Sequence, residues 1–301
     1  MGWLRRASGR LPTRRPPAGG GRAAERAGAG AGRATGLRRG CDGVATASRP
    51  RAEGVLAVGT GLMIAAFEFA SLPAVVGLAL LGAVVAAFSY RALTPSGTTR
   101  AARGLLAGIA MRRLLSAAYF GADTFLPLGP TELRGLGTIE AGPGRSAGAP
   151  TWVAGSALRA RWDDRCGARL RPTYSALGTV VLCVGIVVST ATILIDAVPP
   201  LVAVAGWAIG GFGMGVAYHA ASAAVVAQGP DEQQGRTGAA LQLSQTFAVA
   251  VLGGLGGGAV ALSHAHGAGL GTALGVTFGR TALLAPVAIP VSRRIKVPPA
   301  H

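Results

Sequence analysis

A series of apolar runs from Gly54 onward limits how this chain can fold more than any other feature. Only 14% of the 301 residues are charged, whereas a soluble domain carries about 25%. Each run approaches the roughly 20 residues that cross a bilayer, and a chain in lipid satisfies its backbone hydrogen bonds as helix. We predict an all-α integral membrane protein of about eight transmembrane helices, because little polar chain is left to surround buried core helices. The predicted spans are 54–70, 73–90, 114–130, 142–158, 174–194, 201–227, 238–262 and 269–291.

Basic residues are concentrated in alternate links between these spans. The positive-inside rule places such links in the cytoplasm. Both termini then lie in the cytoplasm, in agreement with an even number of spans, and we expect a multi-pass protein of the cell membrane. The opposite side has only Arg134 and Arg145. The basic links contain Arg91, Arg100, Arg103, Arg112, Arg113, Arg159, Arg161, Arg165, Arg169, Arg171, Arg236, Arg293, Arg294 and Lys296.

Residues 1–53 differ from the rest, because they are rich in Arg, Gly, Ala and Pro and contain no apolar run. Such a segment cannot build a hydrophobic core, and it lacks the apolar region of a secretory signal. We expect a disordered or spurious segment, such as one read from GC-rich sequence upstream of the true start. The alternatives are a disordered cytoplasmic tail and a targeting peptide; a tail that binds nucleic acid or anionic lipid by charge is the weakest functional hypothesis.

Asp123 lies within the third predicted span, in the stretch RRLLSAAYFGADTFLPLGPTELRG (residues 112–135). It follows Arg113 by ten residues, or about 15 Å of helix, which places it near the middle of the bilayer. Desolvation disfavours a charged carboxylate there, so the group can take up and release a proton near neutral pH. We predict proton coupling or cation recognition at Asp123; the alternative is a structural aspartate paired to a neighbouring helix.

Four other polar residues within the predicted spans are candidates for lining a central cavity. Arg280 either neutralises an acid such as Asp123 or is a damaged position. His219 either relays protons or forms a packing hydrogen bond, and we favour the second. Gln242 and Gln245 are three residues apart and therefore share a helix face, where they line a substrate path or join helices. We expect the acidic residue near the end of the first span, Glu68, to reach the headgroups.

Glycine pairs at a spacing of four indicate close helix packing. Small residues at this spacing let membrane helices approach each other closely. The first run, GWAIGGFGMG, lies in the sixth predicted span, and the second, GGLGGG, lies in the seventh. The pairs are Gly206 with Gly210, Gly211 with Gly215, Gly253 with Gly257, and Gly254 with Gly258.

The sequence contains no catalytic motif such as GxSxG, HExxH or a P-loop. His264 and His266 lie in the predicted external loop SHAHGAG without convincing metal co-ligands. Cys41, Cys166 and Cys183 have no CxxC spacing, which argues against a zinc site or a disulfide framework. We therefore expect neither an enzyme nor a cofactor or metal site.

Two long segments resemble the carboxy-terminal half of major facilitator superfamily transporters, in the fourteen-helix drug:proton antiporter branch. The first is RRLLSAAYFGADTFLPLGPTELRGLGTIEAGPGRSAGAPTWVAGSALRARWDDRCGARLRP, and the second is AIGGFGMGVAYHAASAAVVAQGPDEQQGRTGAALQLSQTFAVAVLGGLGGG. The resemblance covers roughly residues 54–295. It implies a transmembrane helix pair at 54–91, a basic cytoplasmic loop at 92–113, a six-helix transporter bundle at 114–292 and a cytoplasmic tail at 293–301.

The resemblance also implies a function and roles for particular residues. It implies transmembrane transport, as proton-coupled efflux of amphipathic or cationic small molecules, with Asp123 facing a central cavity. Asp164, Arg165, Gly167 and Arg169 match the family's cytoplasmic loop motif, which acts as a charge latch, although Ala160 stands where the motif has a glycine.

The chain also departs from the family pattern. The fourth span contains Pro143, Arg145 and Pro150, and Pro130 ends the third span early. No first six-helix bundle precedes the helix pair, although alternating access uses two halves that move about a shared site. The alternatives are therefore a truncated, inactive carrier, another non-transporting membrane protein, or a half-transporter that acts only by assembly with another chain.

Overall fold

The computed structural model describes residues 100–228, 234–267 and 269–295, together with residue 98 and scattered positions between 54 and 91. The prediction for residues 1–53 lies outside the described residues. Most of the first two predicted spans, including Glu68, also lies outside them.

The described residues form helices and turns and contain no strand, which confirms the all-α prediction. Four of these helices, α7 to α10, are long and apolar enough to cross a membrane, which indicates a membrane protein. The structure thus supports four of the eight predicted spans by length and composition. The helices are α4 (Leu105–Asp123), α5 (Thr138–Ser146), α6 (Gly148–Cys166), α7 (Arg171–Leu194), α8 (Leu201–Val226), α9 (Gln234–His266) and α10 (Leu270–Ser292).

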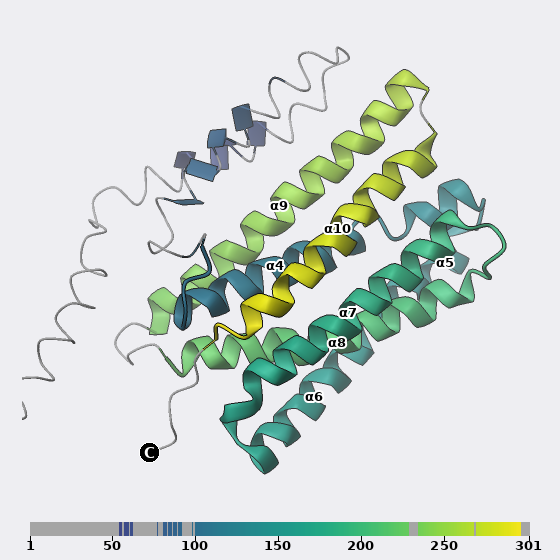
Figure 1. Cartoon of the computed structure of the whole chain (residues 1–301). Coiled ribbons are helices and arrows are strands. Elements are labelled where there is room, and N and C mark those ends of the chain that lie inside the picture. Colours follow the sequence, from purple (N-terminus) through teal and green to yellow (C-terminus); the bar gives the residue numbers. More distant parts are fainter. Residues whose placement is uncertain are drawn as a thin grey trace, which may run out of the picture. The chain divides into compact units, whose positions relative to one another are not determined.

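The long helices run alongside one another, with α8 next to both α7 and α6 (Figure 1). Helix α8 packs against α7, α6 and α4, and α10 packs against α4, α7 and α9. Helix α9 packs mainly on α4 and α10. Its contact with α8 is much smaller than the contacts that α6 and α7 make with α8. Helix α4 therefore joins the α6–α7–α8 group to α9.

Glycines on α8 allow the close approach of two different neighbours. A Cβ atom added at Gly206 would lie 2.7 Å from the Ser189 hydroxyl of α7. A Cβ atom added at Gly211 would lie 2.7 Å from the Thr151 hydroxyl of α6. Real Cβ atoms do not approach heavy atoms so closely, so the two predicted glycine pairs of α8 face α7 and α6 respectively, as close helix packing requires.

The outward surfaces of α7 and α10 are apolar. Leu177, Val180, Val184 and Val187 are all exposed on α7 and follow one another at helical spacing. Helix α10 likewise exposes Val276, Leu283 and Val287. A soluble monomer rarely exposes a contiguous apolar patch of this kind, whereas a helix in lipid has this surface. The polar atoms of buried Ser and Thr residues lie inside the bundle instead.

Helix α4 differs from the predicted third span of 114–130. It begins at Leu105, after Gly104 with a φ of 92°, so Arg112 and Arg113 lie inside the helix rather than in the loop predicted at 92–113. It ends at Asp123, and a π-helical turn follows at Gly129–Leu133. Asp123 is thus the last residue of α4 rather than the middle of a span.

The fourth predicted span, 142–158, falls on two helices. Ala147 keeps a right-handed helical conformation between α5 and α6, and its N–H donates to the Pro143 carbonyl at 3.1 Å. Pro150 lies in the first turn of α6, where a missing N–H costs no helical hydrogen bond. Helix α6 continues to Cys166, beyond the predicted end, because its last two turns are held by charged contacts described below.

Most of the described basic residues lie near one end of the helix bundle. The Gly104 N–H at the start of α4 donates to the Arg294 carbonyl after α10 at 2.9 Å, and Arg171 at the start of α7 donates to the Ala223 carbonyl of α8 at 3.3 Å. The basic links described therefore meet at one end of the bundle, which we call the basic end. Arg134 and Arg145 lie at the other end, beside the ends of α7 and α4. Which end faces the cytoplasm stays a prediction.

Candidate functional site

Partly exposed polar and aromatic side chains meet where α4, α6, α8 and α9 adjoin. We call this set, Arg112, Trp152, Tyr218, His219 and Gln245, the polar face. Its members come from all four helices, so no single predicted span contains the site. It contrasts with the apolar surfaces of α7 and α10.

The guanidinium of Arg112 is the centre of the polar face. Its Nη1 donates to Ser222 Oγ and its Nη2 donates to Gln245 Oε1, both at 3.0 Å. The guanidinium carbon lies 4.3 Å from the centroid of the Tyr218 ring, in cation–π contact. The Tyr218 hydroxyl donates to the same Gln245 oxygen at 2.5 Å. One arginine thus links α4 to both α8 and α9.

Aromatic rings extend from this centre along α4. The rings of Tyr218 and Trp152 meet nearly edge to face, with centroids 5.4 Å apart. Trp152 in turn lies 5.2 Å from Tyr119, which stacks on Trp207 at 4.8 Å. Such pairs stabilise a core by about 0.5–1.5 kcal/mol beyond their buried area. The row of rings fixes α4 and α6 against α8.

His219 lies at the edge of the polar face. A hydrogen bond of 3.0 Å joins its Nδ1 to Ser156 Oγ on α6, and the same nitrogen lies 3.1 Å from the Gly215 carbonyl of α8. Its ring also borders Trp152 and Tyr218. These contacts correspond to the packing hydrogen bond that the sequence favours for this residue.

The two glutamines of α9 have different surroundings, although the sequence places them on one face. Gln245 is partly buried and accepts hydrogen bonds from Arg112 and Tyr218. Gln242 is exposed. Three residues along a helix leave their side chains about 60° apart in direction, so Gln242 does not point where Gln245 does. Gln245 therefore joins α9 to α4 and α8, and that either glutamine lines a cavity stays a prediction.

Asp123 pairs with an arginine of α5. Arg145 donates to Asp123 Oδ2 through Nε at 3.1 Å and Nη2 at 2.9 Å. The aspartate side chain is 14% exposed and the arginine side chain 58% exposed. The prediction that Arg280 neutralises Asp123 is wrong in this structure. Arg280 donates to Thr277 Oγ1 on its own helix at 3.4 Å, and its Nε is buried without an acceptor among the described residues.

A charge cluster closes the junction of α6 and α7 at the basic end. Asp163 accepts hydrogen bonds from Arg159, one turn earlier on α6, and from Arg171 Nε at 2.9 Å. Burial lowers the pKa of Arg159, and the Asp163 carboxylate opposes that shift. Because Arg171 also reaches the Ala223 carbonyl, the cluster ties α6, α7 and α8 together.

The ion-paired acid of this cluster, Asp163, is the residue before the acid of the predicted loop motif, whose latch role stays a prediction. Asp164, Arg165, Gly167 and Arg169 are all exposed, and the acid that holds the arginines is Asp163. A helix turns by 100° per residue, so adjacent aspartates of α6 point to different sides. Gly167 ends the helix with a φ of 74°, a conformation that favours glycine.

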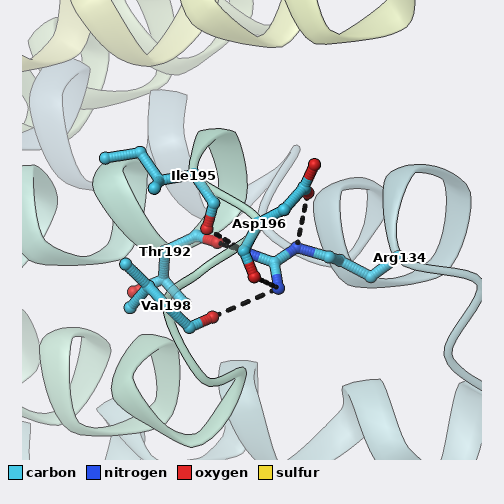
Figure 2. A network of polar contacts seen from close by, with 5 residues as sticks. All are labelled: Arg134, Thr192, Ile195, Asp196 and Val198. Atoms are coloured by element: carbon cyan, nitrogen blue, oxygen red, sulfur yellow. Dashed lines mark hydrogen bonds and ion pairs between the residues drawn. The ribbon is translucent and has the colours of Figure 1, made fainter.

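Arg134 closes the opposite end of α7 (Figure 2). Its Nη1 donates to the carbonyls of Asp196 and Val198, each at 3.1 Å. Its Nη2 donates to the carbonyls of Thr192 and Ile195. The last carbonyls of a helix have no partner within the helix, and a cation there also complements the helix dipole. Its Nε forms an ion pair of 3.5 Å with Asp196 Oδ1.

Sequence reasoning missed Arg112, Tyr218, Arg145 and Asp163 as members of these contacts. The apolar stretch GIAM before Arg112 was a usable signal, because it shows that the helix starts earlier than the arginine pair. Only the opposite charges of Asp123 and Arg145 indicated in the sequence that the two residues could pair. Within the described ranges, no group of three His, Cys, Asp or Glu residues could hold a metal ion.

Comparison of the chain with protein-family models and with curated proteins finds no match. The resemblance to major facilitator transporters therefore stays a prediction from the quoted segments.

Proposed function

We propose that this chain is a membrane protein whose bundle serves as the second half of a proton-coupled carrier that exports small molecules. The observation that carries the proposal is the polar face itself. In lipid, partly exposed side chains such as Arg112 and Gln245 are stable only against water, a solute or another polar surface. A translocation path along α4, α6, α8 and α9 would provide such a polar environment. Helices α7 and α10 instead turn apolar side chains outward.

Under this proposal Asp123 carries the proton. Its partner Arg145 is more than half exposed, so the arginine can move into water when the carboxylate becomes neutral. Protonation then removes the ion pair that connects the end of α4 to α5. A transport cycle can use such a contact because it is made in one protonation state and lost in the other.

The basic end would supply the inner closure of the carrier. Asp163 there takes the latch role that the sequence resemblance gives to Asp164. Its two arginines come from the end of α6 and the start of α7, so the closure depends on both helices keeping their positions. By the positive-inside rule we place this end in the cytoplasm, with the chain in the cell membrane.

Dye efflux in cells that lack their main export pumps tests the proposal. We expect the wild-type chain to support efflux that depends on the proton gradient. Asp123→Asn should remove most of it, because the side chain keeps its size but cannot bind and release a proton. Asp164→Asn, an exposed change of the same kind, should leave efflux unchanged. Equal efflux by wild type and Asp123→Asn would rule out the proton role.

The second candidate is a half-transporter that acts only by assembly with another chain. It is favoured by the partial exposure of the polar face, which no described residue covers fully. The measurement is the mass of the purified protein in detergent, by light scattering. A complex of two or more chains favours assembly, and a monomer that still transports contradicts it.

A further inference from the structure

Arg112 has no carboxylate partner among the described residues, a property that it shares with Arg280 of α10, but Arg112 alone of the two lies against an aromatic ring. Its hydrogen-bond acceptors are the neutral oxygens of Ser222 and Gln245. Arg112 therefore keeps its full positive charge inside the polar face. The arginines that do form ion pairs with aspartates are Arg134, Arg145, Arg159 and Arg171.

The surroundings of Arg112 are also poor in acceptors. A guanidinium has five N–H donors, and the described residues accept from Nη1 and Nη2 only. Its Nε is buried and has no acceptor among the described residues. An arginine within a membrane bundle is normally paired with an acid or with several carbonyls. The described residues thus give Arg112 no counter-charge and only part of the acceptors that its donors can use.

Aromatic rings lie beside this cation and are partly exposed. Tyr218 lies under the guanidinium at 4.3 Å, and Trp152 meets the Tyr218 ring at 5.4 Å. Phe120 of α4 lies 5.9 Å from Trp152. A flat apolar ring can pack against such a surface while a charged group attached to it reaches the arginine.

We propose that Arg112, with the rings of Tyr218 and Trp152, binds an aromatic carboxylate, so that the substrates of this carrier are organic anions. The inference rests on the proposed function and replaces the cationic substrates that the family resemblance implies. A carboxylate supplies the missing charge and acceptors. A cationic substrate would face Arg112 instead, while Asp123 and Asp163 already have arginine partners.

Two probes with the same ring and opposite charge test the assignment. The first is 1-naphthoate and the second is 1-naphthylmethylammonium, each titrated into the purified full chain in neutral detergent by calorimetry. We expect 1-naphthoate to bind about tenfold or more tightly than the amine. Arg112→Gln should weaken the binding of 1-naphthoate by about tenfold or more, as loss of one partner of a charged pair does. The same variant should not weaken the binding of 1-naphthylmethylammonium.

Arg113→Gln is the matched control, because it removes the same charge one residue later. Arg113 faces the Tyr90 ring, with its guanidinium carbon 5.4 Å from the centroid, and lies outside the polar face. This variant should bind 1-naphthoate as the wild type does. An equal loss in both variants would mean that only net charge matters, and it would overturn the assignment.

Gln245→Glu keeps the test decisive if Arg112→Gln fails to fold. It places a carboxylate of nearly the same shape beside Arg112 and should remove 1-naphthoate binding from a folded protein. Unchanged binding of 1-naphthoate in either folded variant, or equal binding of the two probes by wild type, overturns the inference. Because binding is measured without transport, dye efflux without 1-naphthoate binding contradicts this inference alone. Binding without any transport contradicts the proposed function alone.

Discussion

Helices α8 and α9 carry the same kind of glycine spacing, yet they are packed very differently. In the most apolar stretch of α8, 56% of the residues are buried inside the bundle, compared with 28% in that of α9. Gly206 and Gly211 of α8 each lie against a neighbouring helix. A Cβ atom added at Gly253 or Gly257 of α9 would meet nothing within 4 Å.

The difference shows that glycine spacing permits a close approach without providing the neighbour. Helix α7 presents small residues of its own, Gly178 and Gly185, at the height of the α8 glycines, so the two backbones meet. Among the glycines of α9, Gly256 lies against the Phe125 ring, but Gly253 and Gly257 meet no neighbouring backbone. Helix α9 is held instead by side chains, among them Gln245 through its contacts with Arg112 and Tyr218.

The largest effect is expected where the α7 and α8 backbones meet. The added Cβ of Gly185→Ala would lie 2.5 Å from Gly210 Cα and 2.6 Å from the Gly206 carbonyl oxygen. We expect the free energy of unfolding to fall by about 3 kcal/mol, although alanine is the better helix former by about 1 kcal/mol. Denaturation in detergent, followed by tryptophan fluorescence, measures the change.

Gly253→Ala is the matched control on α9. Its added methyl group has open space, so stability should stay the same or rise by up to about 1 kcal/mol from helix propensity. A similar loss in both variants would remove the distinction between the two helices.

A smaller effect is expected at the charge cluster that ties α6, α7 and α8 together. Asp163→Asn leaves Arg159 and Arg171 close to each other without a carboxylate. We expect a loss of about 2 kcal/mol, in the range of hydrogen bonds to charged groups. The neighbouring change Asp164→Asn affects an exposed side chain and should alter stability by less than about 0.5 kcal/mol. A larger loss of stability for Asp164→Asn than for Asp163→Asn in a thermal melt would show that Asp164, not Asp163, holds this junction.

The smallest effect is expected at the side-chain tie of α9. Gln245→Leu removes the oxygen that Arg112 and Tyr218 share, and we expect a loss of about 1 kcal/mol. Gln242→Leu changes an exposed residue three positions away and should cost no more than about 0.5 kcal/mol. The two variants are compared by the same detergent denaturation. If they prove equally stable, then Gln245 does not hold α9 in place.

The four most apolar runs predicted their helices to within a few residues. Span 174–194 became α7 at Arg171–Leu194, and span 201–227 became α8 at Leu201–Val226. Long apolar runs have one way to form a structure in lipid, so their boundaries can be read from composition. The third span begins earlier than predicted because Arg112 lies within the helix, where neighbouring helices offer it hydrogen-bond acceptors.

The candidate site was predicted less well than the helices. Asp123, His219 and Gln245 do make polar contacts between helices, and Asp123 was singled out for its charge alone. Its partner Arg145 is 22 residues away in the sequence, in the predicted fourth span. Neither spacing nor composition relates two such residues until the helices that carry them are placed side by side.

The sequence by itself determined that this chain is helical and that it has long apolar helices. It also determined that the basic residues are concentrated in alternate links between them. Local composition dictates these properties, because each helix satisfies its own backbone. Only the tertiary structure decided which polar groups meet. It brought Arg112, Tyr218 and Gln245 together from three helices, and it chose Asp163 over Asp164. Contacts between helices depend on rotation and register, and a change of one residue turns a side chain by 100°.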